Sequence, residues 1–267
     1  MIRVVAIFAV YNEERFMERV LWHLARQGVE SYVIDNDSTD RTGAIARSFL
    51  GRGVIGMETF PRRGVFEWAP LLKRKEELHR ELGADWYLHE DADQFRYAPN
   101  PFPTLRDGIL AADRAGYNAV EFDVFDFLPT DETESYDHPR FIEEMRYYYY
   151  FKPQPLFQVK AWKNFGQTID LVTSGGHCVA FEGRRIFPEP FVQRHYIALS
   201  REHAVEKYCR KKFSEEEVKV RGWHHPRPSL RPEDFRFPER SRLKLVTGDN
   251  TWDTSEPWTR RPLFGDG

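Results

Sequence analysis

The sequence predicts an α/β protein whose Rossmann-like, mostly parallel sheet is flanked by helices. Short apolar runs alternate with amphipathic segments through residues 4–89, and the glycines Gly28 and Gly83 follow such amphipathic segments. This alternation is typical of βαβ units, and short apolar strands suit a parallel sheet that is covered on both faces. Ligands bind sheets of this kind at the carboxyl ends of the strands.

The first half of the chain supplies the regular elements. The expected strands cover residues 4–10, 31–35, 54–58 and 85–89, and the expected helices cover residues 13–27, 40–50, 68–82 and 103–115. In the first helix Phe16, Val20 and Leu24 recur at intervals of four, which is the spacing of a buried helical face. Asn12 is expected to cap the start of this helix and Gly28 its end.

The second half is expected to be mixed and less regular. Apolar and acidic residues alternate over 119–128, which predicts a half-buried strand. Further strand-like runs are the aromatic 147–151, 156–162 and 178–181, and a helix capped by Ser200 is expected over 201–213. We expect one domain over residues 1–200, made of the halves 1–95 and 96–200, with a C-terminal helix and extended tail (201–267) packed on it.

Composition excludes several classes of protein. A net charge of −3 over 267 residues gives no overall attraction for nucleic acid or for an anionic membrane. Cys178 and Cys209 are too few for a disulfide framework, which favours a reducing compartment. The apolar run at residues 4–10 is too short for a signal peptide, and no stretch reaches the roughly 20 apolar residues that span a bilayer. We therefore expect a cytoplasmic protein, with peripheral membrane contact left open.

The most informative motif is Asp91-Ala92-Asp93, directly after the last expected strand of the first half. In an extended chain, residues two apart point to the same side, so both carboxylates are expected to converge at the end of the strand. Like charges at such a place need a counter-charge, and oxygen ligands favour Mg²⁺ or Mn²⁺ over zinc. An isolated Asp-x-Asp is also common as a solvated turn, so its surroundings decide the interpretation.

Two more polar clusters follow the first and second expected strands, at residues 11–13 (Tyr-Asn-Glu) and 35–38 (Asp-Asn-Asp-Ser). Each cluster alone is compatible with turn and cap chemistry. Because the carboxyl ends of parallel strands meet at one edge, the three clusters together predict a pocket for a nucleotide diphosphate. In such a pocket side chains would contact base and ribose, and the carboxylates would hold a diphosphate-bound metal ion.

With these motifs the chain resembles the family 2 glycosyltransferases of the GT-A fold. The resemblance lies in residues 10–14 (Val-Tyr-Asn-Glu-Glu), 33–40 (Val-Ile-Asp-Asn-Asp-Ser-Thr-Asp) and 90–93 (Glu-Asp-Ala-Asp), in this order and spacing. It covers about residues 1–95 firmly. Over residues 96–200 it is weaker, although 174–177 (Ser-Gly-Gly-His) and 194–196 (Arg-His-Tyr) look like acceptor-side motifs of some members without membrane helices.

The resemblance implies a nucleotide-sugar-dependent transferase of GT-A type. It implies that Asp93 and Asp91 hold Mg²⁺ or Mn²⁺ against the donor diphosphate, and that His195 completes the metal shell or touches the diphosphate. A histidine beside a tyrosine is also often a packed polar residue. The positions that match the donor-binding residues of the family are Val10, Tyr11, Glu13, Asp35, Asp37 and Asp91.

An inverting transferase also needs a base near the acceptor hydroxyl. Many members of the family carry a Glu-Asp pair after the glycine turn, and this chain has His177 there instead. The candidates for the base are Asp170, His177 and Glu182, in this order. Gln94 stands where relatives often have an acidic residue, which predicts weak metal binding.

The expected reaction is the transfer of a single sugar from a nucleotide-diphosphate sugar to a glycan, lipid-linked or small-molecule acceptor. The membrane helices and the Gln-x-x-Arg-Trp motif of processive members are not found in the sequence. One alternative is a catalytically silent homologue that binds nucleotide or carbohydrate. A nucleotidyltransferase is the other alternative, and it should carry a glycine-rich loop where this chain has Tyr11-Asn12-Glu13-Glu14.

Overall fold

The computed structural model of the chain describes residues 2–153, 158–224, 227–248 and 251–264. The chain forms two compact units. Unit 1 consists of residues 1–62, 68–123 and 156–193, and unit 2 of residues 63–67, 124–155 and 194–267. The sequence predicts a single division of the chain at residue 200, whereas the two compact units each combine several separate segments. The predicted boundary stays a prediction.

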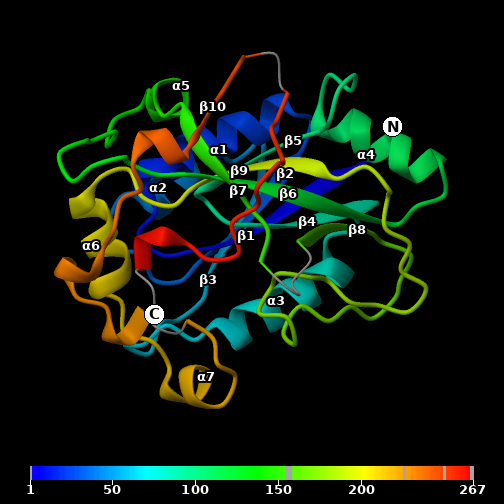
Figure 1. The fold of residues 1–267 in the computed structure, drawn as a ribbon. Coiled ribbons are helices and arrows are strands. Elements are labelled where there is room, and N and C mark those ends of the chain that lie inside the picture. Colours follow the sequence, from blue (N-terminus) through cyan, green and yellow to red (C-terminus); the bar gives the residue numbers. More distant parts are fainter. Residues whose placement is uncertain (1, 154–157, 225–226, 249–250, 265–267) are drawn as a thin grey trace. The chain divides into compact units, whose positions relative to one another are not determined.

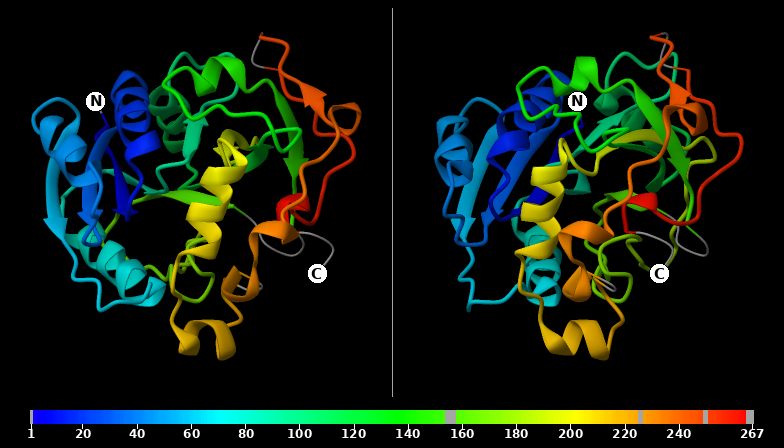
Figure 2. Two further views of the ribbon diagram at one scale, coloured as in Figure 1. Left: turned by 90° about the vertical axis from the view of Figure 1, so that its left-hand side faces the viewer. Right: turned by 60° about the vertical axis from the view of Figure 1, so that its left-hand side comes forward.

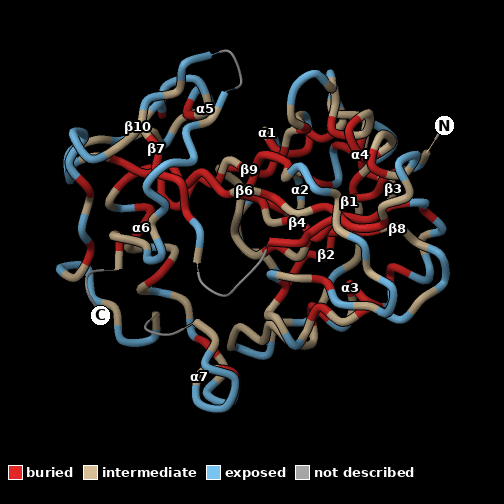
Figure 3. Tube along the Cα trace, turned by 45° about the vertical axis from the view of Figure 1, so that its right-hand side comes forward, coloured by how far each residue is buried: buried red, intermediate tan, exposed pale blue. Residues whose placement is uncertain are grey.

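Unit 1 is built on the predicted, mostly parallel sheet (Figure 1). Its strands, in spatial order, are β3 (Val54–Thr59), β2 (Glu30–Asp35), β1 (Val4–Val10), β4 (Trp86–Glu90), β8 (Val159–Lys163) and the start of β6 (Ala119–Phe127). The first four run parallel, while β8 is antiparallel to both β4 and β6. All residues of β4 are buried, including the polar His89 and Glu90 at its end, as expected for a central strand (Figure 3).

The helices of unit 1 cover the sheet on both faces. They are α1 (Glu14–Arg26), α2 (Thr42–Ser48), α3 (Trp68–Glu81) and α4 (Leu105–Arg114). The path from β1 through α1 to β2, and on through α2 to β3, moves outward in one direction, whereas α3 leads back to β4 on the other side of β1. Right-handed crossovers therefore place α1 and α2 on one face and α3 on the other, as the ribbon shows (Figure 2). The predicted α/β class is confirmed.

The ends of α1 show which local signals are reliable. Gly28 has a φ of 74°, and the following Val29 N–H donates to the Leu24 carbonyl at 2.9 Å, so the predicted glycine stop is confirmed. The prediction that Asn12 caps the start is wrong. The cap position is Glu13, and the Asn12 side chain bonds Thr39 in the neighbouring loop instead.

Three departures from the expected elements lie at residues 94–97, 178–181 and 191–196. A short strand, β5 (Gln94–Tyr97), follows the Asp91–Asp93 motif directly, and β9 (Phe191–Tyr196) was likewise not expected. The strand predicted over 178–181 does not form, because only an isolated bridge joins Ala180 to Asp170. The strand predicted over 156–162 is found as β8, and its first residues lie outside the described part of the chain.

Unit 2 holds the aromatic run as a strand. β7 (Tyr147–Phe151) pairs antiparallel with the end of β6 and with β10 (Lys244–Leu245). Its helices are α5 (Phe141–Glu144), α6 (Arg201–Cys209) and α7 (Glu215–Lys219), and its 3₁₀ turns are η1 (Arg227–Ser229), η2 (Pro232–Asp234), η3 (Arg240–Arg242) and η4 (Pro262–Phe264). Ser200 caps α6 as predicted, but that helix ends at Cys209 rather than at residue 213. In the part of the chain that the structure describes, no helix is long and apolar enough to span a bilayer.

Candidate active site

Three polar clusters lie at the same edge of the sheet in unit 1. The strands that precede them, β2, β1 and β4, are direct neighbours in the sheet. Their register aligns Val10 at the end of β1 with Asp35 at the end of β2, and Phe8 with Glu90 at the end of β4. The alignment confirms that the residues after these strands share one edge, where open α/β sheets bind ligands.

The loops after β1 and β2 are held together by hydrogen bonds. The Asn12 carboxamide accepts from the Thr39 N–H at 2.8 Å and donates to the Thr39 hydroxyl at 3.1 Å. The Glu13 N–H donates to Thr42 Oγ1 at 2.7 Å, and the Asn36 N–H donates to the Val10 carbonyl at 2.8 Å. We call residues 11–14 and 36–42 the paired loops, since these bonds join them into one support.

Both paired loops contain a residue with left-handed backbone. Asn12 and Asp37 each have a φ of 55°, which is uncommon outside glycine and is tolerated best by asparagine and aspartate. The Asp37 carboxylate accepts the Arg62 N–H at 2.6 Å, while Asp35 accepts the Ser38 N–H at 3.0 Å. Backbone strain of this kind concentrates at ligand-binding sites, so its presence in both loops favours a functional site here.

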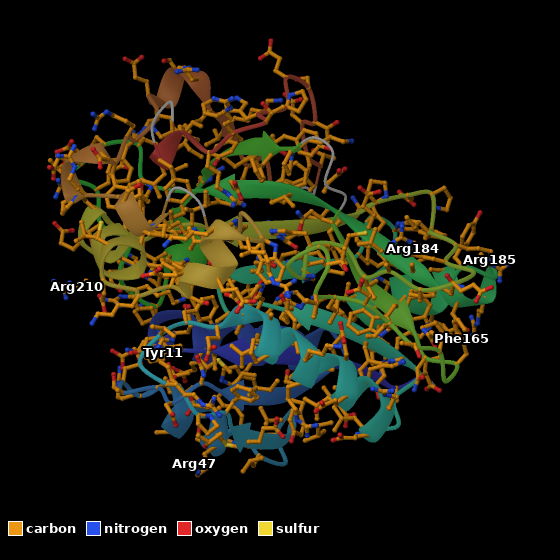
Figure 4. The ribbon with its side chains drawn as sticks, turned by 90° about the horizontal axis from the view of Figure 1, so that it is seen from below. Tyr11, Arg47, Phe165, Arg184, Arg185 and Arg210 are labelled. Carbon is orange, nitrogen blue, oxygen red and sulfur yellow. The ribbon has the colours of Figure 1, made fainter. Side chains whose placement is uncertain are left out.

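Arg62 closes over the first paired loop. Its guanidinium lies 3.7 Å from the centroid of the Tyr11 ring, and it donates to the Asn36 side-chain oxygen at 3.3 Å. Tyr11 follows β1 at the rim of the sheet (Figure 4). Burial lowers the pKa of Arg62. A cation stacked on an aromatic ring at this edge suits an anionic or aromatic ligand.

Asp91 and Asp93 are held by a turn, which corrects the geometry expected from the sequence. The Gln94 N–H donates to the Asp91 carbonyl at 3.2 Å, so residues 91–94 form a tight turn between β4 and β5 rather than an extended end. The carboxylates nevertheless interact: the pKa of Asp91 is lowered overall, and the charge of Asp93 opposes that lowering. Proximity of the pair is thus supported by the turn and not by alternation along a strand.

Lys160 supplies a positive charge to Asp91. Its Nζ lies 3.4 Å from Asp91 Oδ2, and the Lys160 side chain is 2% exposed against 28% for Asp91. Burial raises the pKa of Asp91, but the charges of Lys160 and Lys75 outweigh burial and lower it overall. The Lys160 pKa is also lowered, by burial. Asp91 is therefore ionised and already has a cation beside it.

A second layer of buried charge lies behind this turn. Lys75 from α3 donates to the Glu90 carbonyl at 3.1 Å and lies 3.4 Å from His89 Nδ1. Burial lowers the pKa of Lys75 to about 7. Arg96 and Glu90, both fully buried, form an ion pair at 3.1 Å, yet burial raises the pKa of Glu90 to about 7. Burial also lowers the pKa of His89 well below its usual value, so this ring is neutral.

The glycine turn of residues 174–177 packs against the same layer. The Trp68 indole N–H donates to the Gly175 carbonyl at 2.8 Å. A Cβ at Gly176 would lie 2.7 Å from His89 Cε1, so only glycine allows this approach. His177 is exposed, its Nδ1 lies 3.4 Å from the Gln158 amide nitrogen, and its charge contributes to lowering the pKa of His89.

The other two candidates for the base lie in the surrounding loops. Asp170 accepts the Thr173 N–H at 2.9 Å, which is a turn-stabilising contact, and Glu182 is exposed. Both belong to unit 1 together with His177. The role of any of the three as the base stays a prediction.

His195 lies in unit 2, where it belongs to a buried polar cluster. Its Nδ1 is 2.7 Å from Asp126 Oδ1, and Asp126 Oδ2 accepts from Arg261 Nε at 2.9 Å and from the Tyr149 hydroxyl at 3.0 Å. Burial raises the pKa of Asp126, but the charges of Arg261 and His195 outweigh it and lower the pKa overall. A carboxylate on Nδ1 fixes the orientation of the His195 ring. The prediction that His195 is a metal ligand remains untested.

The donors present fit a divalent ion that is held in part by its substrate. Within the described ranges, no group of three or more His, Cys, Asp or Glu side chains could hold a metal ion. The partly exposed Asp91 and its neighbour Asp93 offer carboxylates, and Mg²⁺ is commonly bound by one or two carboxylates together with substrate phosphates. The residues therefore fit an ion whose remaining ligands come from a bound diphosphate.

Sequence reasoning missed Arg62, Lys75 and Lys160. The signal for Arg62 was available, because a basic pair follows Pro61 after the third strand. Lys160 gave no signal, since a lysine in a strand usually faces solvent. Lys75 lies among charged residues of an amphipathic helix, and only the packing of α3 on the sheet shows that it is buried.

Comparison with known proteins gives a family for the first part of the chain. Residues 5–62 match the family model described as glycosyl transferase family 2, a segment that includes both paired loops and Arg62. A comparison with curated proteins gives no match.

Solved structures of several glycosyltransferases are similar to this chain. A mannosyltransferase from Pyrobaculum calidifontis in complex with GDP-Man and Mn²⁺ is 18% identical, covers 82% of this chain and 67% of its own, and has a TM-score of 0.45. S. aureus TarS 1–349 in complex with UDP-GlcNAc is 17% identical with a TM-score of 0.36 and covers 50% of this chain. This chain spans 39% of that TarS chain.

Glucosyl-3-phosphoglycerate synthase from Mycobacterium tuberculosis, in complex with Mn²⁺, UDP and phosphoglyceric acid, is 18% identical. It covers 47% of this chain and 43% of its own, with a TM-score of 0.33. Because all three TM-scores are below 0.5, the assignment rests on the match of residues 5–62. That match confirms the resemblance to the family 2 glycosyltransferases over residues 5–62, the segment that carries both paired loops.

Proposed function

We propose that this enzyme transfers a single sugar from a nucleotide-diphosphate sugar to an acceptor hydroxyl, with inversion at the sugar and with the help of Mg²⁺ or Mn²⁺. The alignment of three polar clusters at one edge of the sheet carries the proposal, because two of the clusters lie within the segment that matches family 2. Such an edge suits a ligand with a nucleoside at one end and a diphosphate at the other.

In this proposal the paired loops hold the nucleoside and the turn of residues 91–94 holds the diphosphate through the ion. The proposed donor-binding residues are Val10, Tyr11, Glu13, Asp35, Asp37 and Asp91. We add Arg62, because it contacts Asp37 and Tyr11. Asp91 and Asp93 would hold the ion. The ion would offset the negative charge that develops on the leaving diphosphate.

For the base we now favour His177 over Asp170 and Glu182. His177 stands next to Gly176, whose backbone packs against His89 beside the Asp91 turn, whereas Asp170 is engaged with the Thr173 N–H. An imidazole at an exposed turn can serve as a general base toward an acceptor hydroxyl. His177→Ala should then slow sugar transfer without weakening nucleotide binding, and unchanged transfer would exclude this role.

Nucleotide binding is the first test. Isothermal titration of the full chain with UDP, GDP and dTDP in the presence of Mn²⁺ should give saturable binding for at least one of them. Nucleotide sugars that carry the nucleobase bound most tightly are then used as donors in a turnover panel. If no nucleotide binds and no donor is turned over, the proposed function is wrong.

Asp93→Ala tests the diphosphate end of the site. We expect donor turnover to fall by about 100- to 1,000-fold, the usual cost of removing a group that stabilises developing charge. The matched control is Asp85→Ala, at the other end of β4, where the carboxylate accepts the Arg3 N–H at 2.7 Å. The control should keep its turnover. An Asp93→Ala enzyme as active as the control would exclude a role for this carboxylate.

A further inference from the structure

The charges around the Asp91 turn are balanced by the protein itself. Three cationic side chains, Lys75, Lys160 and Arg96, act on the carboxylates of this cluster and are all buried. The carboxylates are Glu90, Asp91 and Asp93. With every group ionised, positive and negative charges are equal in number, so the cluster has no surplus negative charge to attract a free divalent ion.

Within this cluster the ion-pair partner of Asp91 is Lys160. Arg96 forms an ion pair with Glu90 at 3.1 Å, and Lys75 donates to the Glu90 carbonyl at 3.1 Å. Lys160 reaches Asp91 Oδ2 at 3.4 Å from β8, which pairs with β4 beside the turn. A buried ammonium is costly without a counter-charge, so Lys160 and Asp91 stabilise each other.

We propose that Lys160 is a built-in counter-cation for Asp91, with which any divalent ion entering the site must compete. The proposal rests on the proposed function, because it takes Asp91 and Asp93 as the carboxylates of the ion site. The Lys160 ammonium and a divalent ion on Asp91 would both be positive and a few ångströms apart in a buried setting, where such charges repel strongly. The chain alone should therefore bind the ion weakly, and a diphosphate should strengthen binding by adding its own negative charge.

The test measures Mn²⁺ binding to the full chain without nucleotide, by electron paramagnetic resonance of the free ion. Lys160→Met removes the ammonium and keeps a similar apolar stem. We expect Mn²⁺ to bind at least about tenfold more tightly than to the wild type, because repulsion between the charges is lost. Lys160→Arg keeps the charge and should bind Mn²⁺ as the wild type does.

Lys163→Met is the matched control. Lys163 lies on the same strand, but its ammonium pairs with Asp113 at 2.7 Å, and its residue stands opposite Trp86 at the start of β4. This variant removes one positive charge from the protein and should leave Mn²⁺ affinity unchanged. A gain as large as that of Lys160→Met would show a general charge effect and overturn the proposal.

The remaining outcomes are also decisive. Unchanged or weaker Mn²⁺ binding by Lys160→Met, with a normal thermal unfolding transition, overturns the proposal. If Lys160→Met does not fold, Lys160→Gln is measured in its place, with the same expected gain. Failure of the proposed function is separate: it appears as absent nucleotide binding and donor turnover in the wild type, whereas the comparison among the Lys160 variants uses the metal alone.

Discussion

At the scale of single residues, Lys75 is fully buried, and burial lowers the pKa of its amine to about 7. In the unfolded chain a lysine has a pKa of about 10.4. Between these two values the unfolded chain keeps a proton that the folded chain has released. Since the unfolded state then binds more protons, the free energy of unfolding should rise with pH in this range.

Lys75→Met removes this dependence. The free energy of unfolding of the wild type, relative to that of Lys75→Met, should increase by up to about 1.4 kcal/mol per pH unit between about pH 7.5 and 9.5. Urea unfolding of the metal-free proteins at several pH values measures the difference. Lys73→Met, on the same helix with a side chain that is 69% exposed, should track the wild type. A difference between wild type and Lys75→Met that does not change with pH would contradict the buried, weakly basic amine.

The residues of the site divide into those that sequence could predict and those that only packing reveals. The places of Asp35, Asp91 and Asp93 at the edge of the sheet were predictable, because these residues stand at or directly after the ends of expected strands. Lys160 was not, since the identity of its partner depends on β8 pairing with β4 across a long stretch of chain. A buried cation looks the same in sequence as a solvated one.

At the scale of elements, the glycine turn of residues 174–177 depends on one close contact. Gly176 has a φ of +83°, and a Cβ there would meet His89 at 2.7 Å and Leu72 at 3.1 Å. Gly166 has the same φ of +83° with nothing within 4 Å of its Cβ position. An alanine at either position has the same backbone strain, but only an alanine at Gly176 also has a steric clash.

Gly166→Ala should lower the free energy of unfolding by about 1–2 kcal/mol, the cost of a left-handed alanine. Gly176→Ala should lower it by about 1–3 kcal/mol more, because His89 must also move in a packed interior. Urea unfolding of the two variants gives the comparison. Equal losses would show that the turn can shift away from His89 without cost.

Elements were predicted well where burial on both faces fixes them. The run of β1 is apolar throughout and β4 begins with the apolar Trp86, Tyr87 and Leu88, and Gly28 and Gly83 mark helix ends with φ values of 74° and 62°. The short β5 was missed because four residues next to a polar motif give no periodicity. The strand expected at 178–181 does not form, because a strand needs a continuous partner and Ala180 makes only an isolated bridge with Asp170.

At the scale of the whole molecule, the two compact units should respond separately to damage in one of them. In unit 2 the side chain of Asp126 is fully buried and depends on Arg261, from the C-terminal part of the described chain, as a counter-charge at 2.9 Å. The same segment pairs with β7, where the Trp258 N–H donates to the Tyr150 carbonyl at 2.8 Å. Arg261→Met leaves a buried carboxylate with less compensation, which typically costs about 3–5 kcal/mol.

Hydrogen exchange of Arg261→Met should therefore accelerate in β7 and in the end of β6, while β1, β2 and β4 of unit 1 keep their protection. Arg242→Met is a suitable control from the same unit, because its guanidinium lies 5.1 Å from the Trp258 ring centroid rather than on a buried carboxylate. The control should exchange as the wild type does. Uniform acceleration in both units would show instead that the chain unfolds as a single cooperative body.

The bonds between Asn12 and Thr39, and between Glu13 and Thr42, have a consequence for recognition. Because they fix both loops against each other before any ligand arrives, little conformational freedom would remain to be lost if the nucleoside of the proposed donor binds between them. Association should therefore carry a small ordering penalty at this end of the ligand. Selectivity among bases would then depend on the fixed shape of the two loops and not on their ability to adapt.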